Sequence, residues 1–295
     1  MPRLPSASRS VALILVAGVY AVAAGAAGAA VHGLSTDTNL VWQLGAASLA
    51  ATLAVFACSV ALDNSSAFDP YWSVAPMATA AWLVARTPHP GARAWLVAAL
   101  VWAWGARLTW NWIRQWRGPA HEDFRYVDLR RQSGAAYWLV SLCGIHLFPA
   151  LLVWLGSFSM VVAMTHPAAL GALDLAGVVV AAGATLIEAV ADRQLRAFVT
   201  SPREPGSICA RGLWSWSRHP NYFGELMFWW GLFMLALGAD RHALWCIVGP
   251  VAITLLFNVV SIPMMEKHLA ALRPGYAAHR KRVSRLVPRP PGGPA

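Results

Sequence analysis

The feature that most constrains the fold of this chain is a series of long apolar runs with almost no charged residues. Most reach the roughly 17–25 residues that cross a bilayer as a helix, and they cover residues 10–31, 40–62, 71–85, 94–106, 137–164, 170–187, 226–239 and 243–260. Only 12% of all residues are charged, about half the usual fraction in a soluble protein. The sequence therefore predicts an all-α, polytopic transmembrane helix bundle of about eight spans.

The net charge of +10 raises the question of a nucleic-acid partner, but the distribution of the charges argues against one. If the N-terminus is cytoplasmic, all but three of the 23 lysines and arginines fall in inner segments, and the exceptions are Arg86, Arg93 and Arg241. This asymmetry follows the positive-inside rule and supports eight spans with both termini in the cytoplasm. The partner that it indicates is the lipid bilayer.

The cysteines and the common cofactor motifs exclude several kinds of site. The four cysteines are scattered without a C-x-x-C pair, at Cys58, Cys143, Cys209 and Cys246. No disulfide framework and no metal site are predicted from them. The sequence has neither a phosphate-binding glycine motif nor an H-E-x-x-H zinc pattern. A nucleotide would therefore have to bind without a Rossmann domain.

Residues 218–225, RHPNYFGE, place several polar side chains where a membrane helix is expected to begin. Pro220 suits the first position of a helix, because its missing N–H would have no partner there. Arg218 and His219 come just before it, where free backbone N–H groups and the positive end of the helix dipole favour an anion. We expect a phosphate to bind at this point. The alternative is that both residues only hold the helix at the membrane surface.

Asn221 and Glu225 are four residues apart on the same predicted helix, so they share a face, with Tyr222 adjacent. Polar groups at membrane depth are costly and are site candidates for that reason. They could bind a polar ring, or they could instead satisfy a neighbouring helix. Burial would raise the pKa of a carboxyl such as Glu225, which would allow it to hold a proton at neutral pH.

A second cluster lies where the preceding span leaves the membrane. Glu188, Asp192 and Arg196 recur every four residues and line one helix face. The two carboxylates could bind the ribose hydroxyls of a nucleotide. Alternatively, Asp192 forms a structural ion pair with Arg196 or another arginine, and Glu188, which lies deeper, is the better site candidate.

The basic segment after the last span is the third cluster. Pro263 is expected to kink or end that span, and Pro274 with Gly275 to separate it from a short helix. On this helix Tyr276 and Arg280 share a face, with His279 beside them. Its arginines, with Arg282 among them, could bind either anionic lipid or a phosphate. Weaker candidates are Asp69, Asn111, Asn258, the loop 121–130 and His146, which is more simply explained as a packed histidine.

Five strings carry a resemblance over roughly residues 65–290: DPYW, HEDFRYVDLR, EAVADRQLRAF, GLWSWSRHPNYFGELMFWWGLF and SIPMMEKHLAALRPGYAAHRKRVSRLVP. They resemble a bacterial membrane family of unknown function that is grouped with the steroid 5-alpha-reductase C-terminal domain. That superfamily contains steroid 5-alpha-reductases, sterol double-bond reductases and isoprenylcysteine-type methyltransferases. The shared motif matches the segment from Arg218 to Gly224 and the tail from Glu266 through Tyr276 to Arg282.

The resemblance implies an NADPH-dependent reductase that acts on a carbon–carbon double bond in a hydrophobic, steroid-, isoprenoid- or lipid-like substrate. Asn221 and Glu225 favour the reductases over the methyltransferases. The cofactor would be held by Glu188, Asp192, Arg196, Arg218, His219, Asn221, Glu266, Tyr276, His279, Arg280 and Arg282, and Tyr222 or Glu225 would supply the proton. The acidic residue and the tyrosine that steroid reductases use in their N-terminal half have no identified match here.

The resemblance also implies a location and a domain division. We expect a multi-pass protein of the bacterial inner membrane with N-terminal helices over 1–62, a reductase-like domain over 63–290 and a disordered tail over 291–295. The alternatives are a membrane methyltransferase that uses S-adenosylmethionine and a lipid-binding protein without enzymatic activity.

Overall fold

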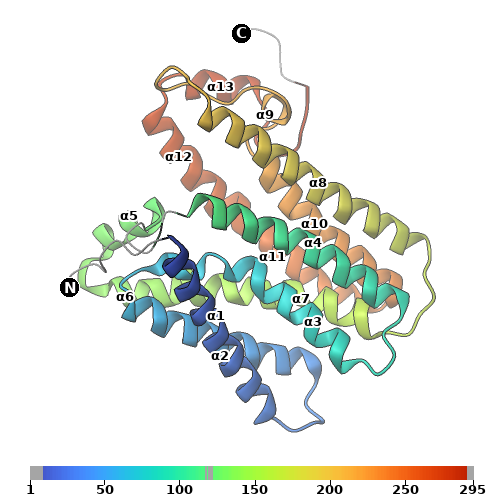
Figure 1. Cartoon of the computed structure of the whole chain (residues 1–295). Helices are drawn as coiled ribbons and strands as arrows, with labels where there is room; N and C mark the ends of the chain where they lie inside the picture. The colour runs from blue at the N-terminus through green and yellow to red at the C-terminus, as the bar shows by residue number, and fades with distance from the viewer. Residues whose placement is uncertain (1–8, 117, 119–121, 291–295) are drawn as a thin grey trace. The chain divides into compact units, whose positions relative to one another are not determined.

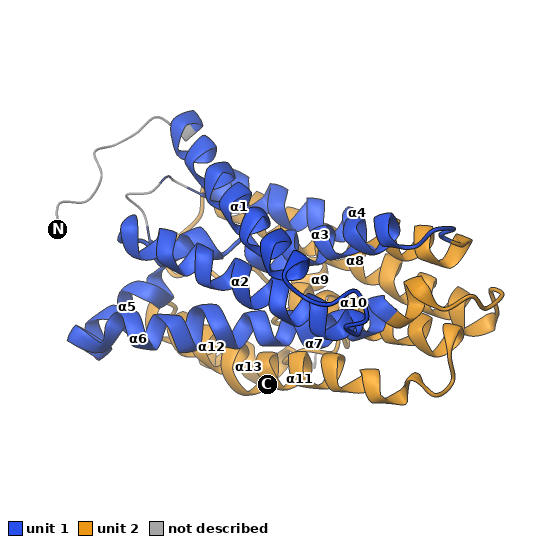
Figure 2. Ribbon diagram, turned by 90° about the horizontal axis from the view of Figure 1, so that it is seen from below, with its two compact units in different colours: residues 1–90, 101–161 blue, residues 91–100, 162–295 orange. Residues whose placement is uncertain are grey.

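The computed structural model describes residues 9–116, 118 and 122–290, and their regular elements are helices (Figure 1). The predicted all-α fold is confirmed for these residues. The chain forms two compact units, one of residues 1–90 and 101–161 and the other of residues 91–100 and 162–295 (Figure 2). The predicted domain boundary at residue 62 stays a prediction, and the predicted tail 291–295 lies outside the described residues.

The first unit, called unit 1 below, holds most of the N-terminal half. Its described residues form helices and no strands. They are α1 (Arg9–His32), α2 (Leu40–Ala61), η1 (Ser65–Phe68), α3 (Tyr71–Arg86), most of α4 (Ala92–Gln115), α5 (Phe124–Ser133), η2 (Gly134–Ala136), α6 (Tyr137–Val140), the π-helical η3 (Ser141–Leu147) and most of α7 (Phe148–Thr165).

The second unit, unit 2, holds the C-terminal half. Its elements are α8 (Ala172–Thr200), α9 (Leu213–Trp216), α10 (Pro220–Ala239), η4 (Ala243–Ile247), α11 (Val248–Leu256), the π-helical η5 (Phe257–Ser261), α12 (Ile262–Leu272) and α13 (Tyr276–Arg282). The helix α10 begins at Pro220, as predicted. The break at Pro274 and Gly275 is also confirmed, but the last span does not end at Pro263, because the chain passes through η5 directly into α12.

Six helical stretches among the described residues are long and apolar enough to cross a membrane. They are residues 10–32, 40–61, 124–165, 172–200, 220–239 and 243–272. These helices indicate association with a lipid bilayer. The helices α3 and α4, which contain the predicted third and fourth spans, are not among the six. The total of about eight spans and the cytoplasmic termini therefore stay predictions.

The glycines of α10 determine how closely it packs against α8, which runs beside it in the opposite direction (Figure 1). Gly224, Gly231 and Gly238 are seven residues apart and so lie on one helix face. A Cβ at Gly231 would lie 2.8 Å from the backbone nitrogen of Ala181, and one at Gly224 would lie 2.8 Å from the carbonyl oxygen of Ala184. Small residues of this kind allow two membrane helices to approach closely.

Candidate functional site

A buried ion pair connects the start of α10 to α12. Arg218 Nε lies 2.7 Å from Glu266 Oε1, and both side chains are buried. The Nη1 of Arg218 also donates to the carbonyl oxygens of Arg280 and Val283, at 2.8 Å each. Its backbone N–H donates to the carbonyl oxygen of Ser284 at 2.8 Å. Arg218 therefore holds the C-terminal segment against the start of α10, a role that the sequence did not suggest.

Glu266 is the centre of this cluster, because its carboxylate contacts three basic side chains. Besides Arg218, its Oε1 lies 3.4 Å from His219 Nε2, and its Oε2 lies 3.4 Å from Arg280 Nε. The Arg280 side chain is 54% exposed, whereas that of Glu266 is 8% exposed. Arg280 can therefore contact Glu266 and still present its remaining N–H groups to a ligand in solvent.

Burial decides the protonation of the aromatic groups around Glu266. It lowers the pKa of His219 to about 4, and although Glu266 opposes this shift, the ring is neutral at pH 7. Burial, with the nearby guanidinium of Arg218, also lowers the pKa of His279. Burial and the Glu266 carboxylate raise the pKa of Tyr276 to about 12, so its hydroxyl remains a neutral donor. Positive charge in the cluster is thus carried by the arginines.

Tyr222 and its neighbours form the aromatic part of the site. The ring of Tyr222 stacks on the ring of His219, with centroids 5.2 Å apart and planes 6° from parallel. Phe257 contacts Tyr222 edge-on, at 4.9 Å between centroids. These contacts hold the phenol at the first turn of α10.

Two buried carboxyl groups lie on the facing helices α8 and α10. Glu225 is 5% exposed and accepts a hydrogen bond from Trp229 Nε1 at 2.9 Å. Glu188 is 2% exposed, and its Cγ lies 2.5 Å from the place that a Cβ on Gly224 would occupy. Gly224 therefore makes room for Glu188 at the level of Glu225. Of the other predicted residues, Asn221 and Asp192 are partly buried, and Arg196 and Arg282 are exposed.

The segment before α10 is fixed to the end of α8 by contacts that the sequence did not reveal. Gln194 Oε1 accepts a hydrogen bond from the backbone N–H of Leu213 at 2.9 Å, and Trp214 Nε1 donates to the carbonyl oxygen of Ala191 at 2.9 Å. Gly212, at a φ of +58°, allows the turn, and a Cβ there would overlap the Gln194 side chain. In the sequence, the glycine ahead of the LWSW string is the signal that could have indicated this turn.

A second buried ion pair of unit 2 lies where α8 begins and α10 ends. Arg93 Nε donates to Asp174 Oδ1 at 2.6 Å, and its Nη2 donates to Asp174 Oδ2 at 3.0 Å. The guanidinium also donates to the carbonyl oxygens of Ala168, Ala169 and Gly238. In the sequence Arg93 is recognisable only as an outer-loop charge, and no local pattern indicates its pairing with Asp174.

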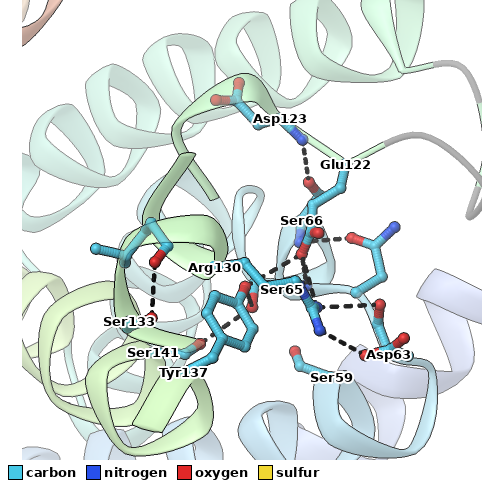
Figure 3. Close-up of polar contacts among 12 residues, drawn as sticks. Ser59, Asp63, Ser65, Ser66, Glu122, Asp123, Arg130, Ser133, Tyr137 and Ser141 are labelled. Carbon is cyan, nitrogen blue, oxygen red and sulfur yellow. Dashed lines mark hydrogen bonds and ion pairs between the residues drawn. The ribbon is translucent and has the colours of Figure 1, made fainter. Parts of the chain in front are cut away.

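Unit 1 has its own polar cluster, which Figure 3 shows in close-up. Arg130 Nη1 lies 2.8 Å from Asp63 Oδ1, and Glu122 Oε1 accepts the backbone N–H of Ser65 at 3.0 Å. The Tyr137 hydroxyl hydrogen-bonds to Ser65 Oγ at 2.6 Å. These bonds hold the short helix η1 between α2 and α3.

Three of the weaker candidates, Asp69, His146 and Asn258, make hydrogen bonds within the protein. Asp69 accepts a hydrogen bond from the Tyr126 hydroxyl at 2.5 Å. His146 is fully buried, with Nε2 3.2 Å from Ser59 Oγ, as expected for a packed histidine. Asn258 Nδ2 donates to the carbonyl oxygen of Thr254, one turn earlier. Of the loop 121–130, residue 121 lies outside the described residues.

Comparison with known proteins gives one family and one relative. The model of a family described as "Protein of unknown function (DUF1295)" matches residues 55–283. An uncharacterized protein of Schizosaccharomyces pombe, C594.04c, is 27% identical over 259 residues, which cover 78% of this chain and 74% of that protein. No solved structure matches the chain significantly.

Proposed function

The chain belongs to the DUF1295 family, and we propose from this premise that it is an integral membrane reductase. In this proposal the enzyme uses NADPH to reduce a carbon–carbon double bond in a hydrophobic substrate. The observation that carries the proposal is the arrangement at the start of α10. There Glu266 pairs with the buried Arg218 and the exposed Arg280, and buried carboxyls lie deeper, on α8 and α10.

The residues around Glu266 fit the phosphates of NADPH. Arg280 and Arg282 are exposed guanidiniums on one short helix, and a guanidinium binds phosphate oxygens through paired N–H groups. The hydroxyl of Tyr276 is buried beside Arg218 without a hydrogen bond of good geometry among the described residues. It is therefore free to donate to a ligand. We assign the phosphates to Arg280 and Arg282, and we assign Arg218 the role of positioning them.

The other predicted contacts are assigned by depth along the helices. Asp192 and Glu188 lie one helical turn apart on α8, and we assign to them the hydrogen bonds from ribose hydroxyls. Asn221, in the first turn of α10, is placed to hydrogen-bond the carboxamide of the nicotinamide. NADPH would supply a hydride at this level of the helix pair.

Reduction of a double bond also needs a proton at the carbon that does not receive the hydride. A general acid must reach that carbon within about 3 Å, and Tyr222 and Glu225 are the candidates. The stack with His219 and the contact with Phe257 hold the Tyr222 hydroxyl in place. Glu225 is buried and accepts a hydrogen bond from Trp229 Nε1 at 2.9 Å, which orients its carboxyl group. Burial protects Glu225 from bulk water, whereas Tyr222 is partly buried.

The buried carboxyls support a second candidate. S-adenosylmethionine carries a sulfonium cation, which Glu188 or Glu225 would attract, and it has no phosphate for Arg280 and Arg282. A methyltransferase therefore needs the deep carboxyls and not the outward arginines. This difference allows the two functions to be separated by mutation.

The experiment measures NADPH affinity in purified protein in detergent for the double variant Arg280→Ala/Arg282→Ala. We expect at least a tenfold loss in affinity with only a small change in melting temperature, because both side chains are exposed and Glu266 keeps its bond to Arg218. Arg241→Ala removes an exposed arginine of unit 2 beyond the other end of α10 and serves as the matched control, with wild-type affinity expected. Equal affinity in all three proteins would contradict the phosphate assignment.

The place of the enzyme in the cell is also part of the proposal. With the positive-inside rule, the end where α10 begins faces the cytoplasm, where soluble cofactors are present. We propose the bacterial inner membrane on the resemblance of the motifs, while the relative found by comparison comes from a yeast.

A further inference from the structure

Unit 1 contains a cavity of about 550 Å³ between α1, α2, α3 and α7. Its volume falls within the roughly 300–1,000 Å³ range of sites that bind small molecules. It exists because the facing helices present small side chains at helical spacing, namely Ala23 and Ala27 of α1, Ala47 and Ala51 of α2, and Ala75 and Ala78 of α3. The wall that results is mainly apolar.

One buried polar group in this wall has no partner for its oxygen. Gln43 is 2% exposed, and its Nε2 donates to the carbonyl oxygen of Thr38 at 2.6 Å. This bond fixes the orientation of the amide, because the reverse orientation would place two acceptor oxygens together. Its Oε1 then has no hydrogen-bond partner among the described residues. Leaving a buried acceptor unpaired is unfavourable, so a ligand that donates to it would gain affinity.

Hydroxyl groups of the same wall already have partners. Tyr71 donates to the carbonyl oxygen of Ser48 at 3.1 Å, and the two hydroxyl oxygens lie 2.9 Å apart. Tyr20 donates to the carbonyl oxygen of Ala67 at 3.2 Å, and Ser157 donates to that of Val153 at 2.8 Å. Gln43 Oε1 is thus a buried acceptor of this wall that has no partner among the described residues.

The charge of the wall selects a neutral ligand. No carboxylate is among the described lining residues, and the basic side chains there, His32 and Arg86, are exposed at the ends of α1 and α3. Arg86 lies over the Trp82 ring with its Cζ 5.7 Å from the ring centroid. Gln43 itself is uncharged and lies at the end of the cavity near the connection between α1 and α2.

We propose that this cavity binds a neutral amphiphile with an apolar body and one hydroxyl group, which donates to Gln43 Oε1. The site belongs to unit 1 and does not depend on the reductase proposal. Two sources share this chemistry: a free long-chain or isoprenoid alcohol, and a bilayer lipid with a free hydroxyl such as diacylglycerol.

The test uses three photoreactive probes with the same diazirine-bearing chain: a long-chain alcohol, its methyl ether and a diacylglycerol. Each is cross-linked to the purified full-length protein, and the labelled peptides are identified by mass spectrometry. We expect the alcohol to label α1, α2 and α3 about tenfold more strongly than the ether, because the ether cannot donate to Gln43. Strong labelling by diacylglycerol would assign the site to a bilayer lipid, and weak labelling to a free alcohol.

Two variants make the test specific. Gln43→Leu should reduce alcohol labelling to the level of the ether and leave ether labelling unchanged. Ala47→Phe should reduce the labelling by all three probes, because it fills the cavity. The melting temperature of each variant checks that it is folded. Equal labelling by alcohol and ether in the wild type, a preference that persists in Gln43→Leu, or labelling confined to other segments would overturn the proposal.

Discussion

Unit 2 contains two buried arginine–carboxylate pairs of nearly equal length, and they differ in what surrounds them. Arg93 and Asp174 lie 2.6 Å apart, and Arg218 and Glu266 lie 2.7 Å apart. At the first pair, all three guanidinium nitrogens donate to Asp174 or to backbone carbonyls. The second oxygen of Asp174 also accepts the backbone N–H of Gly171 at 2.8 Å.

The pair at the start of α10 is not closed in this way. Its carboxylate also contacts His219 and the half-exposed Arg280, each at 3.4 Å. A buried pair stabilises a fold only if further hydrogen bonds satisfy its remaining groups. Arg93 and Asp174 meet this condition through buried partners. Glu266 instead has a contact from its second oxygen to Arg280, whose side chain is exposed to solvent. The first pair is therefore a structural tie, whereas the second holds an exposed arginine at the proposed cofactor site.

Removing Arg93 should have the largest effect on stability. Arg93→Met leaves Asp174 buried without its cation, which typically costs about 3–5 kcal/mol. Chemical denaturation in detergent measures the loss. The double variant Arg93→Met/Asp174→Leu removes both charges and should regain most of it. NADPH affinity at low temperature should stay at the wild-type value, and a stability loss below about 1 kcal/mol would show that the pair is not a structural tie.

Changing Glu225 tests whether this carboxyl is the proton donor of the proposed reduction. Glu225→Gln should lower turnover about 100-fold or more if this carboxyl is the general acid, while Trp229 can still donate to the amide oxygen. The rate of NADPH oxidation with substrate measures this effect, and the melting temperature reports the fold. Tyr222→Phe is the matched variant for the other candidate. Wild-type turnover in Glu225→Gln would exclude that residue as the acid.

Neutralising Glu266 tests whether this residue contributes to NADPH affinity as well as to the stability of the fold. Glu266→Gln leaves Arg218 with its two carbonyl partners, so we expect a stability loss of about 1–3 kcal/mol, smaller than that of Arg93→Met. NADPH affinity should fall about tenfold, because Arg280 is no longer held. Unchanged affinity would mean that Glu266 has only a structural role, like Asp174.

The pH dependence of stability gives the smallest effect. Because the pKa of His219 is about 4 in the folded protein and about 6.5 when unfolded, the unfolded chain binds the proton more readily. Stability should therefore be unaffected above pH 6.5 and fall as the pH is lowered from 6.5 toward 4. The loss of stability caused by His219 is about 1 kcal/mol at pH 5.5, and His219→Gln should not show it. Identical pH profiles for the two proteins would contradict a buried neutral His219.

Local patterns in the sequence were sufficient for the apolar helices and for the residues at the start of α10. Pro220, Asn221 and Glu225 could be placed because their positions depend on helix geometry over a few residues. The spacing of Gly224, Gly231 and Gly238 also marks a packing face, although it does not say which helix packs there.

Pairs between distant residues could not be predicted in this way. Arg218 and Glu266 are 48 residues apart, and Arg93 and Asp174 are 81 apart. Charge and spacing do not tell whether an arginine faces a ligand or a buried carboxylate. For this reason Arg218 was expected at a phosphate, whereas the structure shows it holding the C-terminal segment.

The central claim is that the residues around Glu266, at the start of α10, bind NADPH. It is tested most directly by titrating the purified wild-type protein with NADPH, NADH and S-adenosylmethionine while following its melting temperature. The account predicts a rise with NADPH that is larger than with NADH and absent with S-adenosylmethionine. A rise with S-adenosylmethionine alone, or no rise with any of the three, would contradict it.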